Sequence, residues 1–369
     1  MNSSNFTKTI FECMRLKSLC FWPLRKSFCS EVHRTDSWPQ RVFSGIQPTG
    51  AIHLGNYFGA VARWRELQDG GANTMCCIAD LHSITLPQEP LQLKKNIYQM
   101  TATLLACGID PEKTILFQQS QVPQHAELCW VLACHSTMAR LAHLPQFREK
   151  SASLKEVPVG IYVYPVLQAA DILLYRSTHV PVGEDQVQHL QLAQQLVKTF
   201  NNRYGPTFPS PKAIVGDHTV SRLRSLRDPQ KKMSKSDADP RSRIELMDSP
   251  ADIREKCKKA VTDFTSAVTF NPVSRPGVSN LITIHSLLSG LSPEDICRDS
   301  SGLDTGRYKL VVAEVIAKNI APIREKVIHI MSKHQYLDDV LESGAEKAVR
   351  IARETWNDVK NKVGFTYLL

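Results

Sequence analysis

Short apolar runs alternate with longer amphipathic segments through the middle of the chain. The short runs are typical of buried strands, and the longer segments repeat their apolar residues with the period of a helix. Strands that alternate with helices in this way pair in parallel through right-handed crossovers. The predicted strands are Val42–Gly45, Thr74–Ala79, Thr114–Phe117 and His179–Val182.

Helical spacing follows three of these strands and fixes the expected fold class. The predicted helices contain Leu54–Leu67, Leu93–Leu105 and Glu184–Phe200, and Gly108 ends the second. We therefore expect an α/β fold with a doubly wound parallel sheet. This Rossmann-like domain, with a helical insert, is expected over residues 38–244.

Strand signals end near residue 245, and helix signals continue to the end of the chain. Ser249 is a good N-cap, and Pro250 after it suits the first helical position. Two long amphipathic runs follow, Tyr308–Lys333 and Ala345–Val363. Residues 245–369 are therefore predicted to form a helical domain.

The N-terminal segment differs in composition from the rest. Its first 40 residues contain six Lys/Arg and three Asp/Glu, with serines and bulky apolar residues between them. Basic, serine-bearing segments that are poor in acids are typical of mitochondrial transit peptides. We expect residues 1–37 to be such a peptide, disordered and outside the fold, which predicts a protein of the mitochondrial matrix. A disordered cytosolic tail is the alternative.

Overall composition narrows the class of partner. Lys and Arg number 45 and Asp and Glu 36, and the formal charge of +9 suits an anionic partner. No apolar run reaches the roughly 18 residues of a membrane span, so no membrane association is expected. None of the ten cysteines forms a C-x-x-C pair, which argues against a structural zinc or iron–sulfur site and predicts no protein-bound metal.

The junction "GIQPTGAIHLGN" follows the first predicted strand. Ligands of doubly wound sheets bind beyond the carboxyl ends of the strands, so this junction lies where a ligand is expected. His53 and Asn56 can donate hydrogen bonds beside a helix start, which already favours anions. A glycine-rich turn with a helix-capping Asn is the structural alternative.

Two acids and a histidine lie near the same crevice. Asp80 and His82 close the second strand. Asp171 lies in the apolar stretch "AADILLY", where it is either a cap or solvent-facing residue or a buried acceptor that needs a donor. "VPVGEDQ" again places a glycine and acids after a strand, and a helix start that uses Glu184 and Asp185 explains it equally well.

The segment "DPQKKMSKSDADP", residues 228–240, is predicted to be a loop because of its prolines and small polar residues. Lys231, Lys232 and Lys235 fall within five positions of it. A solvated basic loop is one interpretation. A movable clamp on polyphosphate is the other, since lysine is a compact cation with mobile donors.

These segments together resemble the class I aminoacyl-tRNA synthetases. "HLGN" at His53–Asn56 is similar to their first signature, with Asn56 in place of the usual second His, and "KMSKS" at Lys232–Ser236 matches the second. "FSGIQPTG", "AADILLY" and "VPVGEDQVQH" are similar to tryptophanyl-tRNA synthetases of the bacterial and mitochondrial type. The likeness runs from about Arg41 to the C-terminus.

The resemblance implies a reaction in two steps. The tryptophan carboxylate attacks the α-phosphorus of ATP, pyrophosphate leaves, and the aminoacyl group of tryptophanyl-adenylate passes to a terminal ribose hydroxyl of tRNA(Trp). Mg²⁺ is expected to be bound through the ATP phosphates. The helical domain is implied to bind the anticodon of the tRNA, and the protein is implied to be a homodimer.

The resemblance also assigns residues. The implied ATP site contains Gln47, His53, Leu54, Gly55, Asn56, Gly183, Glu184, Asp185, Leu223, Lys232, Met233, Ser234, Lys235 and Ser236, and the implied catalytic groups are Lys232, Lys235, His53 and Lys150. The implied tryptophan pocket contains Phe43, Gly45, Ala79, His82, Asp171, Val180, Val182 and Gln186. Asp171 would accept the indole N–H, and Gln168 stands where bacterial relatives can carry Met.

Three rival interpretations share parts of this pattern. A tyrosyl-tRNA synthetase shares fold and signatures, but the "GIQPTG" and "GEDQ" contexts favour tryptophan. A nucleotidyltransferase has a related site, but it needs no helical anticodon reader. An RNA-binding protein descended from a synthetase needs neither "HLGN" nor "KMSKS", and both are present.

Overall fold

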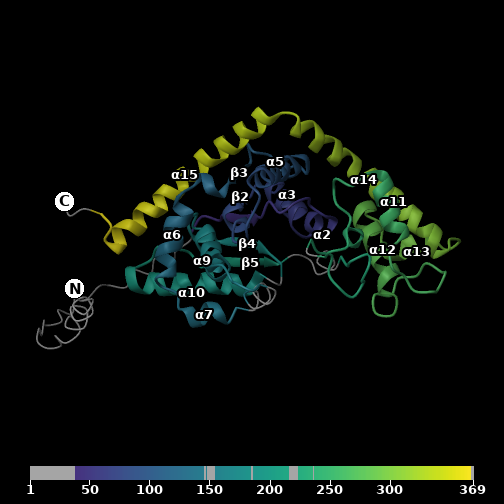
Figure 1. Cartoon of the computed structure of the whole chain (residues 1–369), viewed down its shortest axis with the longest axis horizontal. Helices are drawn as coiled ribbons and strands as arrows, with labels where there is room; N and C mark the ends of the chain where they lie inside the picture. Colours follow the sequence, from purple (N-terminus) through teal and green to yellow (C-terminus); the bar gives the residue numbers. More distant parts are fainter. Residues whose placement is uncertain are drawn as a thin grey trace, which may run out of the picture. The chain divides into compact units, whose positions relative to one another are not determined.

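The computed structural model describes residues 38–144, 147, 154–183, 186–215, 223–235 and 237–366. A five-stranded sheet lies among its helices (Figure 1). The strands are β1 (Val42–Ile46), β2 (Thr74–Ile78), β3 (Thr114–Gln118), β4 (His179–Val182) and β5 (Lys212–Val215). The four predicted strands are confirmed to within one residue at each end.

All strand pairs are parallel, in the order β3-β2-β1-β4-β5. The chain builds outward from β1 through β2 to β3 and then returns to the other side of β1 with β4. The strand order therefore reverses between β1 and β4, and such a switch point opens a crevice at the carboxyl ends. The doubly wound α/β class is confirmed.

The predicted helices are present, with shifted ends. The helices and helical turns are α2 (Leu54–Asn56), η1 (Tyr57–Val61), α3 (Ala62–Asp69), α4 (Asp80–Ser83), α5 (Pro90–Ala106), η2 (Gln119–Gln121), α6 (Gln124–Ala133), α7 (Met138–Ala142), α9 (Val159–Leu173), α10 (Val187–Tyr204), η5 (Pro240–Ser242), α11 (Pro250–Lys258), α12 (Pro276–Ser289), α13 (Pro293–Asp299), α14 (Thr305–Met331) and α15 (His334–Val363). Ser249 caps α11 in a capping box with Asp252, as its position predicted. None of the helices among these residues is apolar and long enough to cross a bilayer.

The side chains of alternating strand residues pack into two separate hydrophobic cores, one on each face of the sheet. Cys76 and Ile78 of β2 pack into one core, with α5 and the helices from α11 to α14. Met75 and Cys77 of the same strand pack into the other, with α6, α9 and α10. This two-residue period is the one a strand buried on both faces must have.

Helix α15 joins the two cores along the edge strand β3 (Figure 1). Its first half packs in the core with α14, and its second half, from Ala345 to Val359, packs in the core with α6. Gly344 lies at the crossing, where an added Cβ would meet the Leu116 carbonyl oxygen at 1.8 Å. The expected boundary between residues 244 and 245 stays a prediction, and the contacts of α15 cross it.

Three details were not anticipated. β5 was missed, because three prolines closely precede it and its run opens on a lysine. The first helix contains a π-helical turn, η1, between α2 and α3. The last helix begins at His334 rather than Ala345, so it is eleven residues longer than its clearest apolar spacing.

Candidate active site

His53 begins the first helix at the carboxyl end of β1. Its side chain is buried, and its Nδ1 accepts a hydrogen bond from the Asn56 backbone N–H at 3.3 Å. A neutral imidazole that accepts at Nδ1 carries its proton on Nε2. The helix cap therefore fixes His53 as a donor through Nε2, beside a helix start that favours anions.

Gly55 explains why the cap can form. A Cβ at this position would lie 2.9 Å from His53 Cε1 and 3.0 Å from His53 Nδ1, closer than real Cβ contacts. Any larger residue would push the ring away from the Asn56 amide. The "HLGN" order is therefore a local steric requirement of this cap.

The "KMSKS" loop lies close to the helix start that His53 caps. The Lys235 ammonium donates to the Gly50 carbonyl at 3.3 Å, and the Leu54 backbone N–H donates to the Ile244 carbonyl at 2.9 Å. Burial is the largest cause that lowers the pKa of His53 to about 3, and the charges of Lys235, Arg243 and Lys232 act in the same direction, in that order. His53 is consequently neutral at pH 7, which agrees with its role as a cap.

Lys235 is partly withdrawn from water. The pKa of its ammonium is lowered to about 8, mainly by burial; the charge of Glu245 opposes the shift and that of Arg243 adds to it. Lys232 is exposed on the same loop. The crevice thus holds two lysines and a neutral histidine donor, a set that suits a polyphosphate.

Asp171 lies on α9, buried to 4% exposure among three donors. His82 Nε2 donates to Oδ2 at 2.8 Å, and Gln119 Nε2 and His125 Nδ1 donate to Oδ1 at 2.7 and 2.6 Å. Burial alone would raise the pKa of this carboxyl, but the charges and hydrogen bonds of His125 and His82 lower it overall. Asp171 is therefore an ionised buried acceptor, and its interpretation as a cap or solvent-facing residue is wrong.

An aromatic cluster supports the Asp171 site from behind. The Tyr175 hydroxyl lies 2.7 Å from His125 Nε2, and burial raises the pKa of that hydroxyl well above its usual value. His125 therefore bridges the Asp171 carboxylate, through Nδ1, and the Tyr175 hydroxyl, through Nε2. Phe43 of β1 stacks on Tyr175 with ring centroids 5.6 Å apart, and Phe117 stacks on His125. The Asp171 carboxylate is thus held in one orientation by His125 and the aromatic rings packed around it.

Comparison with known proteins agrees with this geometry. The family model described as "tRNA synthetases class I (W and Y)" matches residues 36–319. A tryptophan–tRNA ligase of Caldanaerobacter subterraneus is 45% identical over 88% of this chain and 98% of its own. The mitochondrial tryptophan–tRNA ligase of Caenorhabditis elegans is 44% identical over 90% of this chain and 93% of its own.

The chain belongs to the tryptophan–tRNA ligases of class I.

Solved structures of this ligase family share the fold. The tryptophanyl-tRNA synthetase of Campylobacter jejuni, complexed with ADP and tryptophan, is 31% identical, with a TM-score of 0.77. The alignment covers 88% of this chain and 100% of that one. The enzyme class and the Rossmann-like fold expected from the sequence are therefore confirmed.

Besides Asp171 on α9 and the residues of the "HLGN" cap, several predicted site residues lie near the carboxyl ends of β1, β2 and β4 or on the signature loop. Gly45 lies near the end of β1 and Gln47 directly follows it, His82 follows β2, and Gly183 follows β4. Leu223 and Met233 are buried and joined by a backbone hydrogen bond at the loop stem. Four predicted residues lie outside the described part of the chain: Lys150, Glu184, Asp185 and Ser236.

The predicted pocket side chains are only partly linked by observed contacts. Val180 is buried in the same core as Phe43, whereas Val182 is half-buried at the end of β4. Gln168 donates to the Gln186 side-chain oxygen at 3.4 Å, so the residue that departs from bacterial relatives contacts a predicted pocket residue. Their roles toward a ligand stay predictions.

Sequence analysis missed the shell of Asp171, namely Gln119, His125 and Tyr175. Tyr175 lies one helical turn beyond Asp171, and Gln119 directly follows β3, so both carried a usable positional signal. His125, at the start of α6, carried none. Asp80, singled out beside His82, instead caps the turn after β3 by accepting from the Ser120 amide at 2.9 Å and from the Gln118 amide group.

Proposed function

We propose that this ligase attaches L-tryptophan to tRNA(Trp) through tryptophanyl-adenylate. The observation that carries the proposal is the state of Asp171: buried, ionised and surrounded by donors. An ionised carboxylate has about four lone-pair positions. Among the described residues Oδ1 accepts twice and Oδ2 once, which leaves one acceptor position on Oδ2 for a ligand donor such as the indole N–H.

The cationic crevice supports ATP as the second substrate. His53 offers its Nε2–H, and Lys232 and Lys235 bring charge to where pyrophosphate would leave. The substrate carboxylate itself attacks the α-phosphorus, so the protein supplies position and charge rather than a nucleophile. These cationic donors fit Mg²⁺ carried on the phosphates, where the ion would neutralise part of their charge, better than a metal held by protein carboxylates.

Pyrophosphate exchange with each amino acid tests the proposal. We expect exchange with tryptophan, and far weaker exchange with tyrosine and the rest. A tryptophan analogue whose ring N–H is replaced by sulfur sharpens the test. Because the analogue leaves an acceptor of Asp171 unpaired, wild type should discriminate against it by about 5- to 150-fold in kcat/KM. Exchange with tyrosine above tryptophan would contradict the assignment.

We propose that the ligase serves mitochondrial translation. Its support is the basic, serine-bearing composition of residues 1–37, together with the likeness to the mitochondrial enzyme of Caenorhabditis elegans. Bacterial relatives are equally similar, so this likeness alone does not choose the compartment. A variant that lacks residues 1–37 should aminoacylate normally in vitro and fail to enter mitochondria. Import of that variant would contradict the proposal.

We also propose that the ligase is a homodimer and that its C-terminal helices contact tRNA. Family likeness supports the dimer, which sedimentation velocity measures directly. The exposed basic side chains of Arg350 and Arg353 on α15 support the tRNA contact, because they lie away from the apolar face formed by Ala348 and Ala352. Such a face suits a phosphate backbone.

A further inference from the structure

Lys231 and Lys232 lie on one side of a short antiparallel ribbon at the stem of the signature loop. The Met233 N–H donates to the Leu223 carbonyl, and the Ser225 N–H donates to the Lys231 carbonyl, each at 2.9 Å. Arg224 therefore pairs with Lys232 across the ribbon. The position of residue 224 fixes the backbone from which the Lys232 side chain projects.

Backbone groups alternate their direction along a strand. Those of Leu223 and Ser225 point toward the lysine strand, so the N–H and C=O of Arg224 point the other way. There the Asn280 side chain satisfies both: Oδ1 accepts from the Arg224 N–H at 2.9 Å, and Nδ2 donates to the Arg224 carbonyl at 3.0 Å. A carboxamide can do this because it carries a donor and an acceptor in one plane, as a peptide does.

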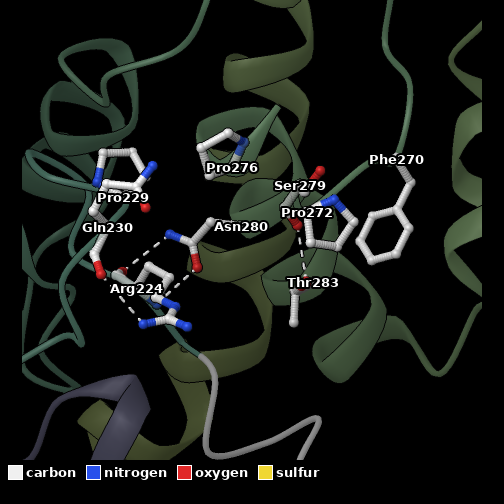
Figure 2. Close-up of a pocket in the computed structure, with 9 residues that line it drawn as sticks. All are labelled: Arg224, Pro229, Gln230, Phe270, Pro272, Pro276, Ser279, Asn280 and Thr283. Atoms are coloured by element: carbon white, nitrogen blue, oxygen red, sulfur yellow. Dashed lines mark hydrogen bonds between the residues drawn. The ribbon is translucent and has the colours of Figure 1, made fainter. Parts of the chain in front are cut away.

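Asn280 reaches the ribbon from a distant part of the chain. It belongs to α12, lies 56 positions from Arg224 in sequence and is 5% exposed. Figure 2 shows the pair at a cavity of about 140 Å³ between the loop stem and α12, with Phe270 and two prolines on the α12 side. Arg224 also braces the turn, because its Nη1 donates to the Gln230 carbonyl at 3.4 Å.

We propose that Asn280 is a positioning residue for Lys232. By bonding the outer edge of the ribbon, Asn280 sets the position from which Lys232 meets the leaving phosphates. The identity of that ligand rests on the proposed function. Asn280 thereby joins α12 to the ribbon through both backbone groups of one residue, Arg224. A displacement of about 1 Å at a reacting group can lower a rate by about 10²-fold.

The variant Asn280→Ala tests the role. It should lower kcat for tryptophan-dependent pyrophosphate exchange by about 10- to 100-fold, while the Kd of tryptophan changes by less than about twofold, since Asp171 keeps its partners. The matched control is Asn201→Ala. Asn201 likewise bonds backbone groups, at Thr207 and Phe208, but it belongs to α10, and none of these hydrogen bonds involves the loop. Its exchange rate should stay within about twofold of wild type.

A double-mutant cycle separates positioning from general stabilisation. If Asn280 acts through Lys232, adding Asn280→Ala to the Lys232→Ala variant should lower kcat by less than about twofold. An equal loss in both backgrounds, or a normal kcat in Asn280→Ala, would overturn the proposal. If Asn280→Ala loses tryptophan binding, Asn280→Gln, which keeps both groups on a longer stem, replaces it. If both variants lose tryptophan binding, Asn280 is a general fold anchor and the proposal is wrong.

A readout without catalysis distinguishes this proposal from the proposed function. In Asn280→Ala the Ser225 and Met233 amides should exchange with solvent at least about tenfold faster, because the ribbon loses one edge. Unchanged exchange at these amides would overturn the positioning role even if the wild-type enzyme is active. An inactive wild type with faster amide exchange in the variant would instead count against the function alone.

Discussion

The Asp171 centre and the signature loop hold their charges in opposite ways. Asp171 is buried, and three side chains donate to its carboxylate within 2.8 Å. Lys235 is half-buried with a carbonyl partner at 3.3 Å, and Lys232 is exposed. A carboxylate that recognises one neutral N–H must be held in a fixed orientation, with few acceptor positions left open. A group that meets charge developing on a departing phosphate needs reach, which a long lysine side chain on a loop provides.

Removing Lys235 should have the largest effect on catalysis, and the effect should be confined to the signature loop. We expect Lys235→Ala to slow adenylate formation by about 10²-fold or more, the scale for losing one preorganised electrostatic group. Tryptophan affinity should change little, because the Asp171 shell is untouched. Single-turnover formation of the adenylate and equilibrium binding of tryptophan measure the two. Normal adenylate formation in this variant would remove Lys235 from the catalytic groups.

Removing Asp171 should produce the reverse pattern. Asp171→Ala should lower kcat/KM for tryptophan by about 5- to 150-fold, with ATP binding nearly unaffected. The variant should also discriminate far less against the sulfur analogue, because no carboxylate is left unpaired. Since three buried donors lose their acceptor, the free energy of unfolding should fall by about 3–5 kcal/mol, as measured in urea.

A milder change sharpens this second pattern. Tyr175→Phe removes only the hydroxyl behind His125, whereas Tyr98→Phe removes a hydroxyl that donates to Asp338 away from the Asp171 shell. The first variant should weaken discrimination against the sulfur analogue by a few-fold, on the scale of about one hydrogen bond, and the control should not. Equal discrimination in wild type, Tyr175→Phe and Asp171→Ala would mean that Asp171 does not read the indole nitrogen.

The pH dependence should separate the regions in wild type. The pKa of Lys235 is about 8, below the ordinary value for lysine, so its charge is lost as pH rises through 8 in the free enzyme. If the charged form is required, kcat/KM for ATP should fall about tenfold per pH unit above that point. Lys235→Arg keeps its charge and should abolish the decline. Tryptophan binding should not follow this profile, because Asp171 stays ionised throughout the range.

The smallest expected effect lies outside both regions. Charge reversal of Arg350 and Arg353 should raise the KM for tRNA on the order of threefold to tenfold and flatten its salt dependence. Adenylate formation should stay normal, since Arg350 and Arg353 belong neither to the Asp171 centre nor to the signature loop. Aminoacylation and exchange rates at several salt concentrations measure both. An unchanged KM would leave these arginines as a solvated surface of the helix.

Local spacing along the chain determined much of this protein. Apolar runs specified four of the five strands, and small polar residues specified caps such as Ser249. The two signatures specified the enzyme family, because the "HLGN" cap and the lysine loop are short segments whose chemistry is complete within a few residues. Periodicity and capping act between neighbours in sequence, so a single chain suffices to reveal them.

Tertiary structure alone decided which distant groups meet. His125 approaches Asp171 from α6, and Asn280 approaches Arg224 from α12, across 46 and 56 positions of sequence. Gly344 likewise has meaning only against the carbonyl of Leu116 on the edge strand. The side chains of His125 and Asn280 could have faced water at no local cost. Their partners follow from how helices pack on the sheet, because a buried polar group must find a donor or acceptor wherever the fold brings one.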